Sequence, residues 1–297
     1  MPCLAAVAQS DYPNLEVLIV DNASKDDSVR VASEILQEFT MKAQVIALPQ
    51  NLGCAGGNNV GWLKASGEFI VFLNPDTEVE PSCFSRLVDL LQKDPQVGIT
   101  GAKMFFPGKK ILQHAGGIVH PNGMTNHYGA GEEDRGQHDT VRDVAYVTGA
   151  GFAIRRNLLE KLGGLDEDYF PAYYEEVDLC LRVRRAGLRV VYVPTAVLVH
   201  HESVSMGSNS SSLHRLFPQM RVRYLVKNLT LRQLAGWAAP FEYRWMRYEQ
   251  AARGYRLKQI RGWIDNVPWL LKHFLGGRKR KLCSRDRTRG RSGDKSA

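Results

Sequence analysis

One junction between an apolar run and a polar turn constrains this chain more than any other feature. Residues Phe69–Leu73 are five consecutive apolar residues, four of them β-branched or aromatic, and Asn74-Pro75-Asp76 follows directly. A run of this length and composition predicts a strand that is buried on both faces. Open α/β sheets bind ligands at the carboxyl ends of such strands, so Asp76 is a candidate for holding a metal or a phosphate.

Two other polar groups lie at the ends of buried elements. One is the acidic cluster Glu175-Glu176-Val177-Asp178, and the other is the pair His200-His201, which closes the apolar run Ala196–Val199. Together with Asp76 they predict one shared active site.

Strands and helices alternate along the first third of the chain. This order predicts βαβ units and an α/β fold with a mainly parallel, Rossmann-like sheet flanked by helices. The polar, glycine-rich stretch Asn51–Gly61 is interpreted as a loop shaped to backbone contacts. The expected strands are Leu15–Val20, Gln44–Leu48, Phe69–Leu73 and Gly98–Phe106, and the expected helices include one with Ser24 at its start and one over Glu80–Asp94.

The second half of the chain is less regular. Residues Pro107–Asp143 predict long loops with a hairpin around His114–His120. The predicted organisation is an α/β domain over residues 1–206, a helical C-terminal extension over 207–275 and a disordered basic tail over 276–297. The expected later elements are helices over 158–162, 178–186 and 213–234 and a strand over 189–193.

Charge and cysteine content exclude several classes of protein. The formal net charge is +8, but residues 278–297 hold nine Lys or Arg and two Asp, so the basicity belongs to the tail. Five widely spaced cysteines without a Cys-x-x-Cys pair indicate neither a disulfide framework nor a structural zinc site. No apolar run reaches the length of a membrane span, and the amino terminus lacks a signal-peptide pattern, so we expect a cytoplasmic protein.

The three candidate groups suit the chemistry of a diphosphate. Mg²⁺ or Mn²⁺ bound to a diphosphate needs only one or two protein carboxylates, which fits Asp76. Crowded carboxylates at Glu175, Glu176 and Asp178 predict a general base, with Glu175 and Asp178 on one face of a helix and Glu176 on another. Each group also has a structural interpretation: a turn at Asp76, dipole-stabilising charge in the acidic cluster, and a packed histidine at 200.

Taken in order, these segments resemble the family 2 glycosyltransferases, inverting enzymes with the GT-A fold, and in particular their rhamnosyltransferase-like branch. The likeness covers roughly residues 3–230, and six ordered motifs are far more specific than any single one. The matching segments are Tyr12–Ser24, Asn51–Gly61, Asn74–Asp76, Thr148–Arg156, Gly164–Arg182 and Pro194–His200.

The resemblance implies a role for each candidate residue. Asp76 corresponds to the last carboxylate of the family's Asp-x-Asp element and would hold the metal together with His200, while Asn74 replaces the first Asp. Glu176 occupies the place of the proposed catalytic base, with Glu175 and Asp178 beside it. The residues implied to bind or shape the site for the donor are Asp21, which would contact the nucleotide base, and Asn22, Asn51, Gly53, Asn59 and Asn74.

The implied reaction moves a sugar from a nucleotide-sugar donor to a hydroxyl group of a glycan or lipid-linked acceptor, with inversion and with Mg²⁺ or Mn²⁺. The nearest-looking branch points to rhamnose from a thymidine diphosphate donor and to polysaccharide synthesis for the cell envelope. By position, His114, Thr148 and the loop Pro107–Asp143 form the acceptor side.

One departure from the family concerns the amino terminus. The family begins with a strand and a turn before the helix that starts here at Pro2, and the sequence contains neither. That strand would lie centrally in the sheet, so its loss predicts a gap with unpaired backbone groups. We expect either a true start upstream of Met1 or a truncated, inactive copy.

Two other functions compete with the transferase. A non-catalytic protein would use the basic tail to bind an anionic surface, and a peripheral contact with the inner face of a membrane is expected whichever function holds. An apolar helix around Trp263, Val267, Trp269, Leu270, Leu271 and Phe274 would then lie in the interface or pack into the core. Nucleic-acid binding is not expected, because no aromatic residue accompanies the basic tail. A nucleotidyltransferase would need a basic phosphate-binding motif near the amino terminus, which is missing from the sequence.

Overall fold

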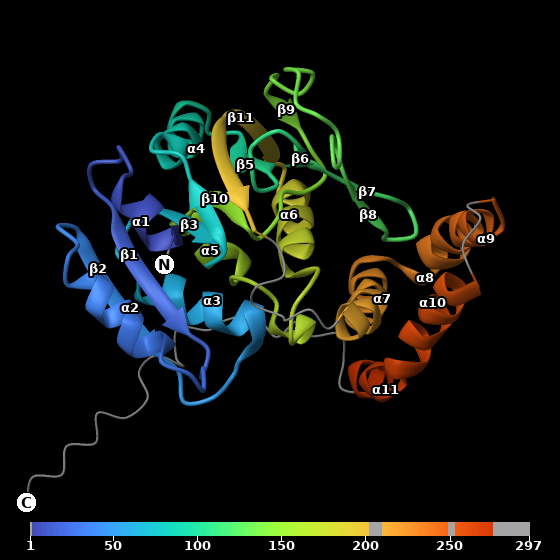
Figure 1. Cartoon of the computed structure of the whole chain (residues 1–297). Coiled ribbons are helices and arrows are strands. Elements are labelled where there is room, and N and C mark those ends of the chain that lie inside the picture. Colours follow the sequence, from blue (N-terminus) through green and yellow to red (C-terminus); the bar gives the residue numbers. More distant parts are fainter. Residues whose placement is uncertain (1, 202–209, 249–252, 276–297) are drawn as a thin grey trace, which may run out of the picture.

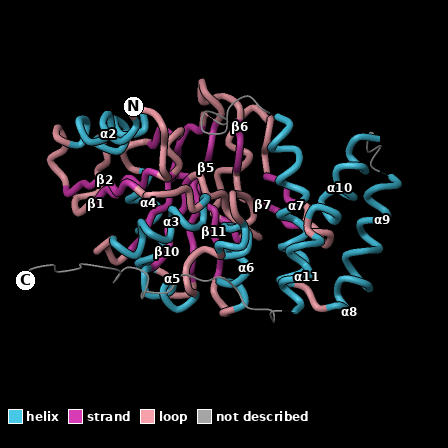
Figure 2. Tube along the Cα trace, turned by 90° about the horizontal axis from the view of Figure 1, so that it is seen from below, coloured by secondary structure: helices cyan, strands magenta, loops and turns pink. Residues whose placement is uncertain are grey.

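The computed structural model describes residues 2–201, 210–248 and 253–275. A central sheet carries helices on its faces, and helices α7–α11 lie together on the side away from β1 and β2 (Figures 1 and 2). The elements are α1 (Pro2–Ala8), β1 (Glu16–Asp21), α2 (Ser28–Leu36), β2 (Lys42–Ala47), α3 (Gly53–Lys64), β3 (Phe69–Leu73), β4 (Thr77–Val79), α4 (Cys83–Lys93), β5 (Val97–Phe105), β6 (Leu112–His114), β7 (Gly117–Val119), β8 (Thr125–His127), β9 (Arg142–Asp143), β10 (Gly151–Arg155), α5 (Arg156–Leu162), α6 (Glu175–Arg185), β11 (Arg189–His200), α7 (Ser210–Asn228), α8 (Leu231–Gln233), α9 (Ala239–Tyr248), α10 (Arg253–Asp265) and α11 (Val267–Leu275).

The main sheet is mixed, whereas the sequence predicted mainly parallel pairing. Its strand order is β3-β10-β5-β11-β4, and β5–β11 is the one parallel pair among these neighbours. β10 runs antiparallel between β3 and β5, so β3, β5 and β11 still point the same way. Their carboxyl ends therefore share one edge, and this is the edge where the polar groups were expected to meet.

β1 and β2 form a separate parallel sheet. Among the residues that the structure describes, β1 pairs with β2 alone, and β3 pairs with β10 alone. The two sheets are therefore not joined by backbone hydrogen bonds between β1 and β3. An upstream start of the chain stays a prediction.

The glycine-rich stretch is a helix, α3, and the prediction of a loop at residues 51–61 was wrong. Its glycines let the helix lie close to β1 and to Asn22, which follows it. A Cβ on Gly61 would come 3.0 Å from Cγ2 of Val20, and one on Gly57 would come 3.3 Å from the side-chain Nδ2 of Asn22. Close packing against β1 stabilises α3, and this offsets the destabilising effect of glycine in a helix.

β11 joins two strands that the sequence predicted separately. Its register against β5 shifts between Val193 and Val197, where Pro194 interrupts the ladder. The long strand carries His200 to the same end as the turn after β3, because His200 pairs with Thr77 of β4.

The C-terminal helices are packed against the α/β core. Met220 and Tyr224 of α7 are buried in the same apolar cluster as Phe152 of β10 and Tyr192 of β11. None of the helices in the described ranges is long and apolar enough to cross a bilayer. The predicted domain limits at 206 and 275 and the predicted disorder of the tail fall at or outside the described ranges and stay predictions.

Candidate active site

Asp76 and His200 meet at the shared sheet edge. Nε2 of His200 lies 3.2 Å from Oδ1 of Asp76, and Nδ1 of His200 donates to Oε1 of Gln113 at 2.8 Å. The backbone amide of His201 donates to the carbonyl oxygen of Asp76 at 2.8 Å, which fixes the turn to the strand end. The His200 contact lowers the pKa of Asp76 despite partial burial.

The donor set fits a divalent cation that is held mainly by a diphosphate. Oδ1 of Asp76 is buried, and no well-aligned hydrogen bond reaches it from the residues that the structure describes. Nδ1 of His200 keeps its bond to Gln113, so a cation that takes the place of a proton between Nε2 and Asp76 would meet a lone pair of Nε2 at that point. The described residues contain no cluster of three or more His, Cys, Asp or Glu side chains around one point, so oxygens of the ligand would have to complete the coordination.

Asn22 shapes the start of α3. Its Oδ1 accepts from the amide of Leu52 at 2.7 Å and its Nδ2 donates to the carbonyl of Gly53 at 3.0 Å. Oδ1 of Asn51 accepts from the amide of Gly53 at 2.8 Å. The Asp21 carboxylate, at the end of β1, accepts from the amide of Ser24 at 3.1 Å. Four of the predicted donor-side residues are thus brought together. Asn22 and Asn51 fix the backbone of residues 52–53 at the start of α3.

Gly53 is required where it stands. Its φ is +72°, and a Cβ would come 2.7 Å from the ring of Phe170 and 2.8 Å from the carbonyl oxygen of Pro171. The next amide, of Cys54, donates to that same carbonyl at 2.7 Å. The start of α3 is therefore held against the segment that leads to the acidic cluster.

Glu175 and Glu176 line one small cavity. Its volume, 10 Å³, is about that of one water probe, and the other lining residues are Cys54, Asn58, Phe72, Gly149, Phe152 and Leu165. Asn74, in the turn with Asp76, donates its amide to the carbonyl of Ala150 at 3.2 Å, next to Gly149. The acidic pair, the α3 start and the Asp76 turn are therefore neighbours in one site.

The pKa values of both carboxyl groups in this acidic pair are raised. Loss of water, with added repulsion from Glu175, raises the pKa of Glu176 to about 8. Burial also raises the pKa of Glu175, although the Cys54 thiol hydrogen-bonds to it. Oε2 of Glu175 is buried without a hydrogen-bond partner among the described residues. A carboxylate with its pKa near neutrality is suited to take a proton from a hydroxyl group.

Two consecutive tyrosines form a strained turn directly before the acidic pair. Tyr173 and Tyr174 have φ values of +82° and +71°, a region that non-glycine residues seldom adopt. The hydroxyl of Tyr174 donates to the carbonyl of Gly123 at 2.7 Å, and its ring packs on Phe217 and Tyr224 of α7. No local sequence signal predicts this strained turn, which tertiary contacts hold in place.

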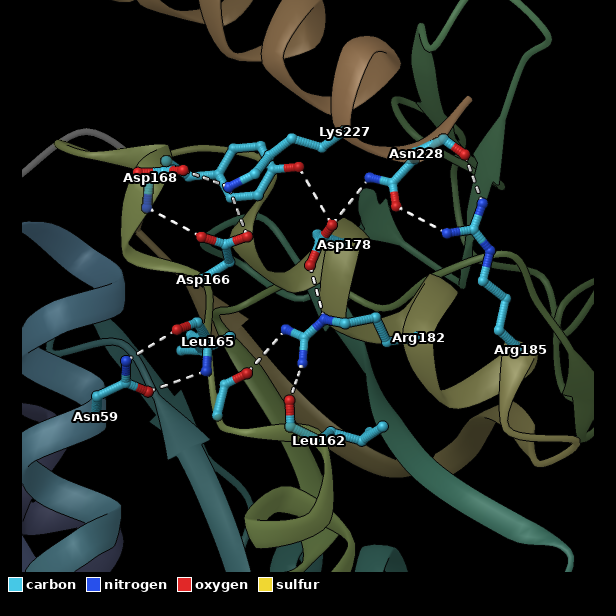
Figure 3. Close-up of polar contacts among 12 residues, drawn as sticks. Asn59, Leu162, Leu165, Asp166, Asp168, Asp178, Arg182, Arg185, Lys227 and Asn228 are labelled. Atoms are coloured by element: carbon cyan, nitrogen blue, oxygen red, sulfur yellow. Dashed lines mark hydrogen bonds and ion pairs between the residues drawn. The ribbon is translucent and has the colours of Figure 1, made fainter. Parts of the chain in front are cut away.

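Asp178 follows Glu175 by three residues on α6, but it is not among the residues that line the cavity. It is fully buried, and its Oδ2 accepts from Nε of Arg182 at 2.8 Å. Its Oδ1 accepts from Nδ2 of Asn228 at 2.9 Å and from the hydroxyl of Tyr169 at 3.2 Å (Figure 3). These contacts leave it no open side for a substrate. Asp178 therefore holds α6 in place, and the catalytic candidates narrow to Glu175 and Glu176.

A buried lysine ties α7 to the segment before α6. Nζ of Lys227 lies 2.7 Å from Asp166 Oδ2 and 2.6 Å from Asp168 Oδ2 (Figure 3). Asn59 of α3 holds the same segment from the other side, because its Nδ2 donates to the carbonyl of Leu165 at 2.8 Å and its Oδ1 accepts from that residue's amide at 2.9 Å. Asn59 is 1% exposed, so it shapes the site from behind.

Of the two side chains predicted for the acceptor side, His114 lies in the core and Thr148 lies beside the cavity. His114 is fully buried, and neither ring nitrogen has a partner among the described residues, so burial lowers its pKa well below the usual range and it cannot contact an acceptor. Thr148 lies beside Gly149, within the site, and bonds to the amide of Ala150. A separate open hollow of 440 Å³ lies over Lys103 and Phe105 of β5, where Lys103 pairs with Asp134 and Asp139.

Sequence comparison identifies relatives of the chain. The family described as Glycosyl transferase family 2 matches residues 2–163. O-antigen biosynthesis protein RfbC of Myxococcus xanthus is 37% identical over 67% of the chain and 16% of its own length. An uncharacterized protein, y4gI of Sinorhizobium fredii, is 31% identical over 72% of the chain and 23% of its own length. N-acetylglucosaminyl-diphospho-decaprenol L-rhamnosyltransferase of Mycobacterium tuberculosis is 26% identical over 81% and 82%. The chain thus spans less than a quarter of the length of the first two.

Solved structures show the same fold. GalNAc-T7 with UDP, GalNAc and Mn²⁺ superposes with a TM-score of 0.64 at 14% identity, over 91% of the chain and 54% of that protein. Mannosyltransferase PcManGT from Pyrobaculum calidifontis, with GDP-Man and Mn²⁺, gives 0.57 at 15% identity, over 89% and 81%. These neighbours are GT-A glycosyltransferases, so the expected GT-A fold is confirmed.

Proposed function

The chain belongs to glycosyl transferase family 2, and we propose on this basis that it transfers a sugar from a nucleotide-sugar donor to an acceptor hydroxyl group with inversion of configuration. The observation that carries the proposal is the placement of two groups on either side of one backbone contact. Asp76 and His200 lie 3.2 Å apart and would hold a cation, and Asn74, in the turn of Asp76, donates its amide to Ala150. Gly149, next to Ala150, lines the cavity that also contains Glu176, a partly buried carboxylate with a raised pKa.

The proposed step is a single displacement at the anomeric carbon. Glu176 accepts the proton of the acceptor hydroxyl, whose oxygen forms the new bond to the anomeric carbon. The bond from that carbon to the diphosphate oxygen breaks, and its electron pair leaves with the nucleoside diphosphate. Attack opposite to the leaving group inverts the configuration.

Several residues of the chain prepare this step. Asp76 and His200 would hold Mg²⁺ or Mn²⁺, whose positive charge, when bound, offsets the charge on the diphosphate. Asp21 and Asn22, at the end of β1, are placed to contact or shape the nucleotide site, and the Asn51–Gly53 backbone bounds it. Glu175, which is buried beside Glu176, helps to keep the pKa of the base high.

The printed functions of the relatives suggest the substrate class. Two of them concern an O-antigen and an L-rhamnosyl transfer to a diphospho-decaprenol compound. We therefore propose a sugar such as rhamnose as the transferred group, a glycan or lipid-linked acceptor, and polysaccharide synthesis for the cell envelope. The enzyme would then work at the membrane face where lipid-linked acceptors lie.

Donor hydrolysis and binding test the proposal. Purified protein is incubated with Mn²⁺ or Mg²⁺ and a panel of nucleotide sugars, and release of nucleoside diphosphate is measured alongside donor binding by calorimetry. We expect one donor to bind in a metal-dependent manner and Asp76→Ala to abolish that dependence. If no nucleotide sugar binds under any condition, the transferase function is refuted and a non-catalytic surface-binding role takes its place.

A further inference from the structure

Helices α10 and α11 bury polar side chains and expose large apolar ones among their basic residues. A helix on a protein surface normally does the reverse, with its apolar stripe against the core. Gln259 and Asn266 are buried, at 4% and 0% exposure, while Leu257, Ile260 and Ile264 are each more than half exposed. The outward apolar residues, which we call the outer stripe, are Leu257, Ile260, Ile264, Val267, Leu271 and Phe274.

Contacts with α7 fix this orientation. Gly262 of α10 lies against Pro218 of α7, whose atoms would be 2.9 Å from an added Cβ. Nδ2 of Asn266 donates to the carbonyl of Gln219 at 2.8 Å, and its Oδ1 accepts from Arg223 at 3.0 Å. At Gly262 and Asn266 the inner side is therefore closely packed and hydrogen-bonded to α7. Steps of three and four residues place Leu257, Ile260 and Ile264 on one side of α10, and Val267, Leu271 and Phe274 on one side of α11, where all six are exposed.

Positive charge is concentrated in the same part of the chain. Residues 239–297 hold sixteen Lys or Arg and five Asp or Glu, a net charge of +11, whereas residues 1–238 have a net charge of −3. Arg256, Lys258, Arg261 and Lys272 are exposed on α10 and α11 themselves. The apolar stripe and the basic side chains thus occupy the same two helices, at one side of the molecule (Figures 1 and 2).

We propose that the outer stripe docks on the surface of an anionic bilayer, with the basic side chains against the lipid headgroups. An apolar stripe alone would suit a second copy of the chain equally well. Two copies meeting here would bring the exposed Arg256, Lys258, Arg261 and Lys272 of one copy against the same four residues of the other, while anionic lipids attract that charge. The combination of an apolar stripe with flanking Lys and Arg is that of a helix lying in the membrane interface.

Docking here would serve the lipid-linked acceptor, and in that respect it rests on the proposed function. The exposed outer stripe would supply the contact with the bilayer surface. α7 connects the helices of the outer stripe with the proposed active site. It packs on α10, and its Lys227, Asn228 and Tyr224 contact the segment and the helix that hold Glu175 and Glu176.

Vesicle co-sedimentation of the full chain tests the proposal without donor or acceptor. The wild type is compared with Leu257→Ser/Ile260→Ser/Ile264→Ser on vesicles of phosphatidylcholine with phosphatidylglycerol, and on phosphatidylcholine alone. We expect wild-type binding to anionic vesicles only, weakened by salt, and weaker by about tenfold or more in the triple variant. The matched control Ile111→Ser/Val141→Ser removes exposed apolar residues from another part of the surface and is expected to bind as wild type.

Three results would overturn the proposal. The first is equal binding by the wild type and the triple variant, and the second is an equal loss in the control variant. The third is a wild-type dimer in sedimentation velocity that the triple variant lacks, without vesicle binding, which would assign the stripe to a second copy. Donor hydrolysis is expected to be the same in the triple variant and wild type, so failed docking and failed transferase activity are separate outcomes.

Discussion

Gln113 of β6 accepts a hydrogen bond from Nδ1 of His200 at 2.8 Å, and this bond leaves Nε2 of His200 facing Asp76 at 3.2 Å. The pairing fixes both the ring orientation and the tautomer that a metal-binding histidine needs. Gln113 therefore prepares the proposed cation site although it does not itself face the carboxylate.

Replacing Gln113 by Leu keeps the volume but removes the acceptor for Nδ1 of His200. We expect the affinity for Mn²⁺ in the presence of a nucleoside diphosphate to fall by about 10- to 100-fold. Calorimetric titration measures this change. Gln37→Leu, at an exposed position, is the control, and an unchanged Mn²⁺ affinity in Gln113→Leu would show that His200 is oriented by other contacts.

Glu176→Gln removes the proposed base and keeps the shape of the side chain. Turnover is expected to fall by about 10²- to 10⁴-fold with donor binding retained. The wild-type rate should rise with pH until about 8, where Glu176 loses its proton. Initial rates from pH 6 upward at saturating donor check both points. Glu38→Gln, which is exposed, should leave rate and profile unchanged; a flat wild-type profile would argue against Glu176 as the base.

The same substitution should change how stability depends on pH. The pKa of Glu176 is raised from 4.5 to about 8 in the folded protein, so between these values the folded state holds a proton that the unfolded state has released. Stability therefore falls as pH rises across this window. Glu176→Gln should be more stable than wild type above pH 8, by about 1 kcal/mol or more, and the gain should vanish near pH 4.5. Urea unfolding at both pH values measures the difference, and a constant offset would contradict the assignment.

Lys227→Met tests the buried lysine between Asp166 and Asp168. The substitution leaves two buried carboxylates without the cation that neutralises them, so we expect a loss of about 3–5 kcal/mol in the free energy of unfolding. Denaturant midpoints measure it. Lys161→Met changes an exposed lysine on α5 and should cost about 0.5 kcal/mol or less. Similar losses in both variants would mean that the two ion pairs contribute little.

Gly53→Ala and Gly187→Ala separate backbone strain from steric clash. Both glycines have positive φ, +72° and +81°, so both substitutions carry the left-handed cost of about 1–2 kcal/mol. An added Cβ has no neighbour within 4 Å at Gly187 among the described residues, but at Gly53 it meets the Phe170 ring and the Pro171 carbonyl. Gly53→Ala should therefore be less stable than Gly187→Ala by about 1–3 kcal/mol and should bind donor more weakly. Equal stabilities would show that the segment at Pro171 moves freely.

The predictions that succeeded rest on local patterns. The run Phe69–Leu73 is the strand β3, and the motif order led to the family that the comparison confirms. The glycine-rich stretch failed because its helix depends on close approach to β1 and on the Asn22 hydrogen bonds, which come from another part of the chain. Mixed strand pairing was missed because nothing local to residues 151–155 tells which neighbours they join.

The amino-acid sequence by itself determined the α/β class, the family and the candidates Asp76, His200, Glu175 and Glu176, because apolar runs and motif residues are properties of neighbouring positions. Tertiary structure alone decided which of these carboxylates is free to accept a proton from a substrate and which one is engaged in holding the fold. Asp178 lies two residues from Glu176, yet it is occupied by Arg182 and Asn228, while Glu176 lines the cavity. The physical reason is that burial and pairing come from residues distant in sequence, and those surroundings set whether a carboxylate fixes a helix or accepts a proton.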